Sequence, residues 1–337
     1  MKTHIKKSIL TLLALCCLPL SFASAADSPR VVVSIKPLHS LVSGVMAGIG
    51  NPQLLVKKGS PHGYSLRPSE AKALAKADLV VWVGHELESF LEKPLQTLAK
   101  HSLHLELADQ LEQDLLAKRH GGTWENHADH ADHAERAERA ERAEHAEHAE
   151  HAEHAEHADI AHGDEQNRSD LHLWLDPKIA KKIVTETEKV LIDIDPTQAQ
   201  RYRDNAAHMR QKLTELDIQL KQKLAPVRHH PYLVFHAAYQ YFETAYNLNA
   251  VGSVTIDPER KPGAKRISEI RHKLQETNAR CVFSEPQFES RLVATIIEGT
   301  GVKTATLDPL GTDIPAGPEA YFQLMQYLAD NLVEGLK

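Results

Sequence analysis

Hydrophobic and amphipathic segments alternate through the first part of the chain. Continuous apolar runs cover residues 30–35, 53–57, 78–83 and 103–107. Segments with helical spacing of their apolar residues follow at 38–47, 68–77 and 86–99. Strands that alternate with helices are typical of a parallel sheet whose faces are covered by helices. We therefore predict that residues 26–195 form an α/β lobe.

The second half of the chain repeats this pattern. Its apolar runs cover residues 232–235, 250–254, 280–283 and 303–307. The same argument predicts a second parallel-sheet lobe over residues 226–337.

A long amphipathic segment separates the two halves. Its apolar residues recur every three or four positions, at Ala206, Met209, Leu213, Leu216, Leu220 and Leu224. This spacing predicts one helix over residues 196–225, about 45 Å long, with Asp195 as its cap and Pro196 in its first turn. The predicted fold is thus α/β, with two Rossmann-like lobes joined by one long rigid helix. Such folds place their ligands in the cleft between the lobes.

The N-terminus has the pattern of an export signal. Lys2, Lys6 and Lys7 precede an apolar stretch at 9–20, and Ala23-Ser24-Ala25 follows it. The apolar stretch is shorter than the roughly 20 residues that span a bilayer. Residues 1–25 are therefore predicted to be a removed signal peptide, and the mature chain is expected in the periplasm.

Histidine is the one residue type whose frequency in this chain is informative. The net charge of −7 argues against a nucleic-acid partner, but 22 histidines are unusual for 337 residues. Ten of them lie in residues 120–162, where Ala-Asp-His, Ala-Glu-Arg and Ala-Glu-His triplets repeat. This insert has few residues to bury and is predicted to be disordered. It is also predicted to collect zinc weakly through His127, His130, His133, His145, His148, His151, His154 and His157.

Four candidate ligands lie outside the insert. His62 follows the second strand, His172 follows the insert, His236 ends a strand, and Asp308 follows the last strand. Strand ends of both lobes meet at the cleft, so these side chains have a route to one another. Three neutral imidazoles suit Zn²⁺, whereas Mn²⁺ sites contain more carboxylates.

The stretches around these residues resemble a known family. They are His62–Ser69 (HGYSLRPS), His172–Pro177 (HLWLDP), Val234–His236 with Tyr239, Ser284–Phe288 (SEPQF) and Leu307–Gly311 (LDPLG). In this order they resemble the metal-specific substrate-binding proteins of bacterial ABC importers, within which the zinc-uptake (ZnuA-type) branch is the most similar. The resemblance extends over nearly the whole mature chain.

The resemblance implies a site and a role. His62, His172 and His236 would bind Zn²⁺, with Asp308 or a water molecule in the fourth position. Some relatives have Glu directly before the first histidine, where this chain has Pro61. Glu285 and the Tyr239 hydroxyl are candidates for orienting the imidazoles. The chain would be a monomeric binding protein and not an enzyme, and it would deliver Zn²⁺ as cargo to a membrane permease.

Other functions remain open from the residues alone. Three histidines with a free position also describe a zinc hydrolase, although no His-Glu-x-x-His or Gly-x-Ser-x-Gly sequence is present. A manganese-binding member of the same importer family is a further alternative. So is a metal-buffering or adhesion protein whose whole function lies in the insert.

Overall fold

The computed structural model describes residues 28–119, 124, 168–256, 258, 262–288 and 290–337. The predicted signal peptide and the eight histidines of the predicted weak zinc collector lie outside the described residues. The predictions made for them are therefore not addressed by the structure.

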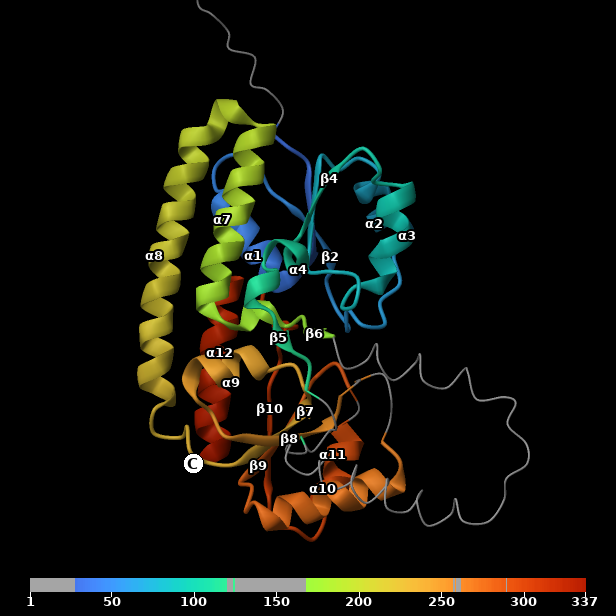
Figure 1. Cartoon of the computed structure of the whole chain (residues 1–337), viewed down its shortest axis with the longest axis vertical. Coiled ribbons are helices and arrows are strands. Elements are labelled where there is room, and N and C mark those ends of the chain that lie inside the picture. Colours follow the sequence, from blue (N-terminus) through green and yellow to red (C-terminus); the bar gives the residue numbers. More distant parts are fainter. Residues whose placement is uncertain (1–27, 120–123, 125–167, 257, 259–261, 289) are drawn as a thin grey trace, which may run out of the picture.

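The N-terminal lobe contains a parallel four-stranded sheet in the order β2-β1-β3-β4 (Figure 1). Its strands are β1 (Val31–Ile35), β2 (Gln53–Val56), β3 (Leu79–Trp82) and β4 (Leu103–Glu106). Every residue of β1 and β3 is buried, since helices cover both faces of the sheet. This explains why these strands appear in the sequence as continuous apolar runs and not as alternating ones.

The C-terminal lobe repeats the design with the order β10-β9-β7-β8, again all parallel. Its strands are β7 (Tyr232–His236), β8 (Ala250–Thr255), β9 (Cys281–Ser284) and β10 (Lys303–Thr306). The strands of both lobes lie within a residue or two of the apolar runs in the sequence. The predicted two-lobed parallel α/β fold is confirmed.

Helices and short helical turns connect the strands. The α-helices of the first lobe are α1 (Lys36–Val45), α2 (Pro68–Leu74), α3 (Glu92–Thr97), α4 (Leu107–Gln110) and α7 (Pro177–Ile194). Those of the second lobe are α9 (Gln240–Tyr246), α10 (Ala264–Glu276), α11 (Ser290–Ile297) and α12 (Ala320–Leu336). Single 3₁₀ turns are η1 (Ser89–Leu91), η2 (Glu112–Asp114), η3 (Leu173–Leu175) and η4 (Pro196–Gln198).

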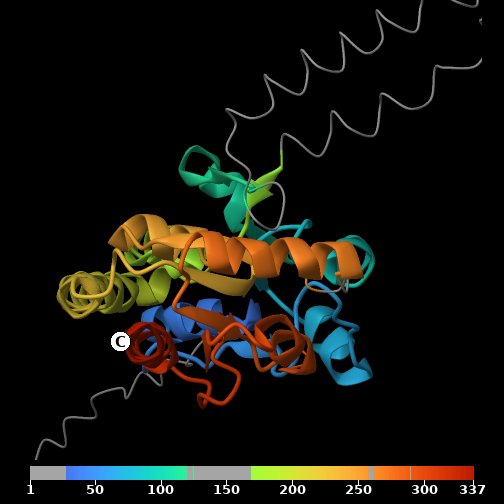
Figure 2. The same ribbon diagram turned by 90° about the horizontal axis from the view of Figure 1, so that it is seen from below.

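The chain passes from one lobe to the other through α8 (Ala199–Leu224). This helix lies beside α7 and also contacts α1 and α12 (Figure 1). Its six predicted apolar-face residues are all buried. Figure 2 shows α8 and α12 nearly end-on at one edge of the molecule.

The start of the linking helix differs from the prediction. Residues 196–198 form the 3₁₀ turn η4, and α8 begins only at Ala199. Asp195 does not cap it, because its carboxylate accepts hydrogen bonds from Thr197 Oγ1 at 2.6 Å and Tyr202 Oη at 3.2 Å. The side chain thus fixes the turn between α7 and α8 through contacts with nearby residues.

One apolar cluster is continuous through both lobes. It includes the inward-facing residues of β1 and β7, the apolar face of α8, the buried face of α12 and Trp174. Gly44 allows α1 to approach α8, because a Cβ atom there would overlap the side chain of Met209. Two smaller clusters lie on the outer faces of the two sheets. Within the described residues, no helix is long and apolar enough to cross a membrane.

Candidate metal site

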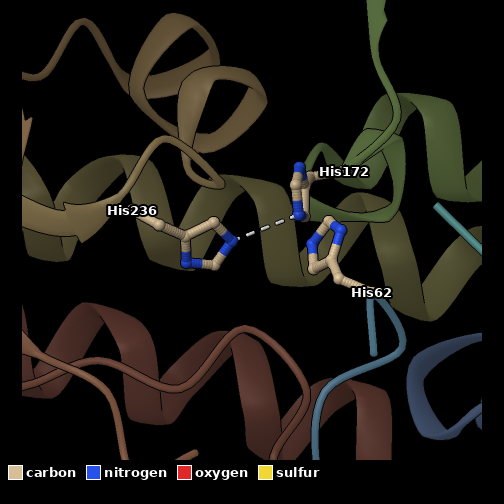
Figure 3. Close-up of side chains that lie close together, drawn as sticks. All are labelled: His62, His172 and His236. Atoms are coloured by element: carbon tan, nitrogen blue, oxygen red, sulfur yellow. Dashed lines mark hydrogen bonds between the residues drawn. The ribbon is translucent and has the colours of Figure 1, made fainter. Parts of the chain in front are cut away.

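Three predicted ligands come together where the two lobes meet. One ring nitrogen from each of His62, His172 and His236 lies within 4.8 Å of the others (Figure 3). The ring centroids are 5.2–5.8 Å apart. In the part of the chain that the structure describes, this is the only cluster of three such donors that meets this distance.

The His62 loop follows β2 and is tied to the start of α2. Glu70, buried in the first turn of α2, accepts hydrogen bonds from Tyr64 Oη at 2.9 Å and from the Arg67 backbone N–H at 2.8 Å. Pro68 begins the helix, where its missing N–H is harmless. The sequence from His62 to Ser69 therefore forms a compact turn that presents His62 to the cleft.

His172 is held by a neighbouring carboxylate. It follows the short strand β6 (Ser169–Asp170), which pairs antiparallel with β5 (Leu116–Ala117). Asp170 Oδ1 accepts a hydrogen bond from His172 Nδ1 at 2.7 Å and from the His172 backbone N–H at 3.0 Å. The pairing leaves Nε2 as the free ring nitrogen of His172, which is the one that faces the cluster.

His236 is held in the same way from a different element. It is the last residue of β7, and its Nδ1 donates to Glu285 Oε1 at 2.6 Å. Glu285 follows β9, the neighbour of β7 in the sheet. The Nε2 atoms of His172 and His236 are 3.4 Å apart. With both Nδ1 atoms protonated, two lone pairs face each other there, an arrangement that is favourable only with a proton or a metal cation between them.

The electrostatics of the site favour the neutral form of His62. Burial lowers the pKa of His62 well below its ordinary value, and the neighbouring His172 and His236 lower it further. Neutral imidazole is the form that binds a metal ion. Burial, followed by the nearby Glu285 carboxylate, raises the pKa of Tyr239 well above its ordinary value. The Tyr239 hydroxyl therefore remains protonated.

The histidines line a small cavity with a free volume of about 10 Å³, comparable to one water-sized sphere. The rest of its lining is Ser60, Pro61, Trp174, Glu285, Gln287, Phe288, Pro309 and Leu310. Trp174 closes one wall, since its ring lies 5.3 Å from that of His172 and its Nε1 donates to the Pro309 carbonyl at 2.9 Å.

Asp308, the fourth predicted ligand, lies outside both the metal-binding group and the cavity lining. It is buried, and its carboxylate accepts hydrogen bonds from neighbouring backbone N–H groups and from Gln287. Ligation by Asp308 stays a prediction. Pro61, directly before His62, is buried and lines the cavity, so no carboxylate enters from that side.

The sequence did not predict a part in the site for Asp170 or for Gln287. The signal for Asp170 was its place two residues before His172. Gln287 had no signal beyond its place in the stretch Ser284–Phe288, because its role depends on contacts with residues 308–312.

Two lobes of parallel α/β structure with a buried histidine cluster between them define a metal-binding protein of the two-lobed substrate-binding class. The family described as zinc-uptake complex component A, periplasmic (ZnuA), matches residues 31–335. The chain belongs to this family, as its sequence stretches predicted.

Named relatives cover nearly the whole chain. The high-affinity zinc uptake system protein ZnuA of Brucella abortus (strain 2308) is 46% identical over 313 residues, covering 93% of each chain. The protein of the same name from Yersinia pestis is 34% identical over 343 residues, covering 99% of this chain and 98% of the relative.

Solved structures share the fold at lower identity. A crystal structure of ZnuA has a TM-score of 0.71 and 21% identity, over 92% of this chain and all of the other. A mutant of the laminin-binding adhesin Lmb from Streptococcus agalactiae has a TM-score of 0.70 and 21% identity, with the same coverage. These likenesses confirm the fold class.

Proposed function

We propose that this chain captures Zn²⁺ in the periplasm through His62, His172 and His236 and delivers it to the permease of an ABC importer. The observation that carries the proposal is the pair of carboxylate–histidine contacts, Asp170 with His172 and Glu285 with His236. They fix two Nε2 lone pairs toward the point that His62 also faces. The relatives named as high-affinity zinc uptake proteins support Zn²⁺ as the cargo.

The donor set distinguishes the proposal from its alternatives. Three imidazoles are the preferred ligands of zinc, and the two nearby carboxylates contact the far nitrogens of the rings instead of the metal position. This favours zinc over manganese. We infer the role of a binding protein, as opposed to a hydrolase, from the family, and this role is part of the proposal.

Zinc titration of a His62→Ala, His236→Ala double variant tests the site. The expected result is loss of the tight site, measured by competition with a chelator of known affinity. The matched control is the His208→Ala, His272→Ala double variant, because both of these histidines are exposed and lie on helices. Unchanged tight binding in the His62→Ala, His236→Ala variant would contradict the proposal.

The insert is proposed as an accessory collector of zinc. Residue 162 lies only ten positions before His172, and the insert leaves the fold through the β5–β6 ribbon next to this ligand. Deleting residues 120–162 is expected to lower the number of zinc ions bound while keeping one tight site. Loss of the tight site on deletion would contradict this two-tier arrangement.

Periplasmic location and removal of residues 1–25 belong to the same proposal. The mature protein, isolated from the periplasm, is expected to begin at Ala26 and to be a monomer. N-terminal sequencing and size-exclusion chromatography with light scattering check both points.

A further inference from the structure

Asp308 is directed into its own loop. Its Oδ1 accepts hydrogen bonds from the backbone N–H groups of Leu310 and Gly311, each at 3.0 Å, and from Gln287 Nε2 at 2.6 Å. Its Oδ2 accepts from the Thr312 backbone N–H. A carboxylate with four donors is already satisfied, and binding a metal ion would require it to give up several of them.

The same loop is fixed from the opposite side by the N-terminal lobe. Lys36, buried at the start of α1, donates from Nζ to three backbone carbonyls, those of Gly311 at 2.5 Å and of Thr312 and Ile314 at 2.8 Å. The loop amides thus bind Asp308 while the loop carbonyls bind Lys36. Turning Asp308 toward the histidines would break contacts on both sides.

Gln287 connects this loop to the histidine cavity. It lines the cavity with the three histidines, and its Nε2 donates to Asp308 and to Thr312 Oγ1 at 3.0 Å. These two contacts fix the orientation of the amide, because the flipped form would place Oε1 against the Asp308 carboxylate. Gln287 Oε1 is then buried without a hydrogen-bond partner among the described residues.

A buried carbonyl oxygen beside a metal site needs a donor. Three histidines leave one position of a tetrahedral zinc site open, and water is the usual occupant. We propose that Gln287 is a positioning residue whose Oε1 accepts a hydrogen bond from the water that completes the zinc coordination. Asp308 acts through Gln287, as its anchor, and is not a ligand. This inference rests on the proposed three-histidine site.

A double-mutant cycle tests the arrangement. Gln287→Leu and Asp308→Asn are each expected to lower zinc affinity about 10-fold, the lower end of the effect of removing an outer contact. The double variant is expected to lose no more than Gln287→Leu alone, because Asp308 acts through Gln287. Gln323→Leu, an exposed glutamine on α12, serves as the control and should not change the affinity.

Co²⁺ provides a readout that a purely structural role would not change. Its visible spectrum depends on the number and geometry of donors. Asp308→Asn should keep the four-coordinate spectrum, because Asp308 is not a donor in this arrangement. Gln287→Leu should shift the bands, because the bound water, which is a donor, loses its acceptor and changes its position. Thermal unfolding without metal checks that each variant is folded, and Gln287→Met replaces Gln287→Leu if the latter is not.

Two results would overturn the inference. A loss of affinity in Asp308→Asn as large as in His236→Ala, and additive with Gln287→Leu, would make Asp308 a ligand. An unchanged affinity and Co²⁺ spectrum in the folded Gln287 variant would remove Gln287 from the site. Failure of the three-histidine site is seen separately, as equal zinc binding by the wild type and by the His62→Ala, His236→Ala variant.

Discussion

The orientation of single imidazoles depends on carboxylates that the chain brings from other elements. Asp170 precedes His172 by two residues, whereas Glu285 reaches His236 across neighbouring strands, 49 positions apart in sequence. Both carboxylates are buried, and neither lies opposite a lysine or arginine ion-pair partner among the described residues. Their charges therefore act mainly on the imidazoles and on a bound cation.

Replacing Glu285 tests this role. Glu285→Gln keeps the size of the side chain but removes its charge, so zinc affinity is expected to fall about 10- to 100-fold. Competition titration with a chelator measures the change. Glu298→Gln, at an exposed position in the same lobe, is the control. Equal affinities of the wild type and Glu285→Gln would show that the charge is not used.

Glu88 is a further buried carboxylate, in the first lobe and outside the metal site. Its Oε2 accepts hydrogen bonds from the backbone N–H groups of Val83 and Gly84, yet burial raises its pKa from 4.5 to about 7. Between about pH 4.5 and pH 7 the folded state keeps a proton that the unfolded state has released. The free energy of unfolding therefore falls as the pH rises through this window.

Glu88→Gln should remove this dependence. Relative to the wild type, the free energy of unfolding of the variant is expected to rise by about 3 kcal/mol from pH 4 to pH 8. Urea unfolding of the metal-free protein at several pH values measures it. Glu86→Gln, two positions earlier and exposed, is the control. A difference between Glu88→Gln and the wild type that is constant with pH would contradict the assignment.

Among the structural elements, the β5–β6 ribbon joins the insert to the metal site. Tyr241 of α9 donates from Oη to the Asp170 carbonyl at 2.6 Å and accepts from the Leu116 backbone N–H at 3.0 Å. Arg119, just beyond β5, pairs with the buried Glu243 of α9. The base of the insert is therefore fixed to the second lobe beside the residue that orients His172. In Figure 2 this ribbon stands out from one face of the molecule.

Breaking the Arg119–Glu243 pair tests the importance of this attachment. Arg119→Met leaves the Glu243 carboxylate buried without its partner and is expected to lower the free energy of unfolding by about 3 kcal/mol. The Arg119→Met, Glu243→Leu double variant should recover part of the loss. Denaturant unfolding measures both. If the changes in the free energy of unfolding of Arg119→Met and of Glu243→Leu add up to that of the double variant, the pair does not interact.

At the scale of the whole molecule, the lobes are packed on one shared core. Trp174 and Tyr321 lie in the cluster that both lobes contribute to, and Tyr321 Oη donates to the Trp174 carbonyl at 2.7 Å. Ser40 of α1 accepts from the Tyr321 backbone N–H and donates to the Pro318 carbonyl. A wide opening of the lobes would break these contacts, so the metal site is expected to exchange zinc through local movement of its loops.

Because residues from both lobes form the site, zinc should stabilise the whole fold. At a free zinc concentration 100 times the dissociation constant, the free energy of unfolding is expected to rise by about 2.7 kcal/mol. Thermal unfolding with and without zinc, on the insert-deleted protein, measures this. The His62→Ala, His236→Ala variant should show no such rise. A rise of equal size in that variant would place the stabilising ion elsewhere.

The sequence by itself determined the elements and the donors. Short apolar runs that alternate with helical patterns indicate strands covered on both faces, so the eight core strands were predictable, and the three histidines were identified as candidate donors. The helix α7 was not delimited. The turn η4 was predicted as part of α8, but Asp195 bonds Thr197 and Tyr202 instead of capping the helix. Only the tertiary structure decided which carboxylates serve the histidines. Asp308 has the right chemistry for a ligand, but three backbone N–H groups of its loop and Gln287 already occupy it, whereas Asp170 lies two residues from His172 and Glu285 meets His236 through the pairing of β7 with β9. Hydrogen-bond partners are chosen by proximity in the folded chain, and residue type alone does not determine proximity.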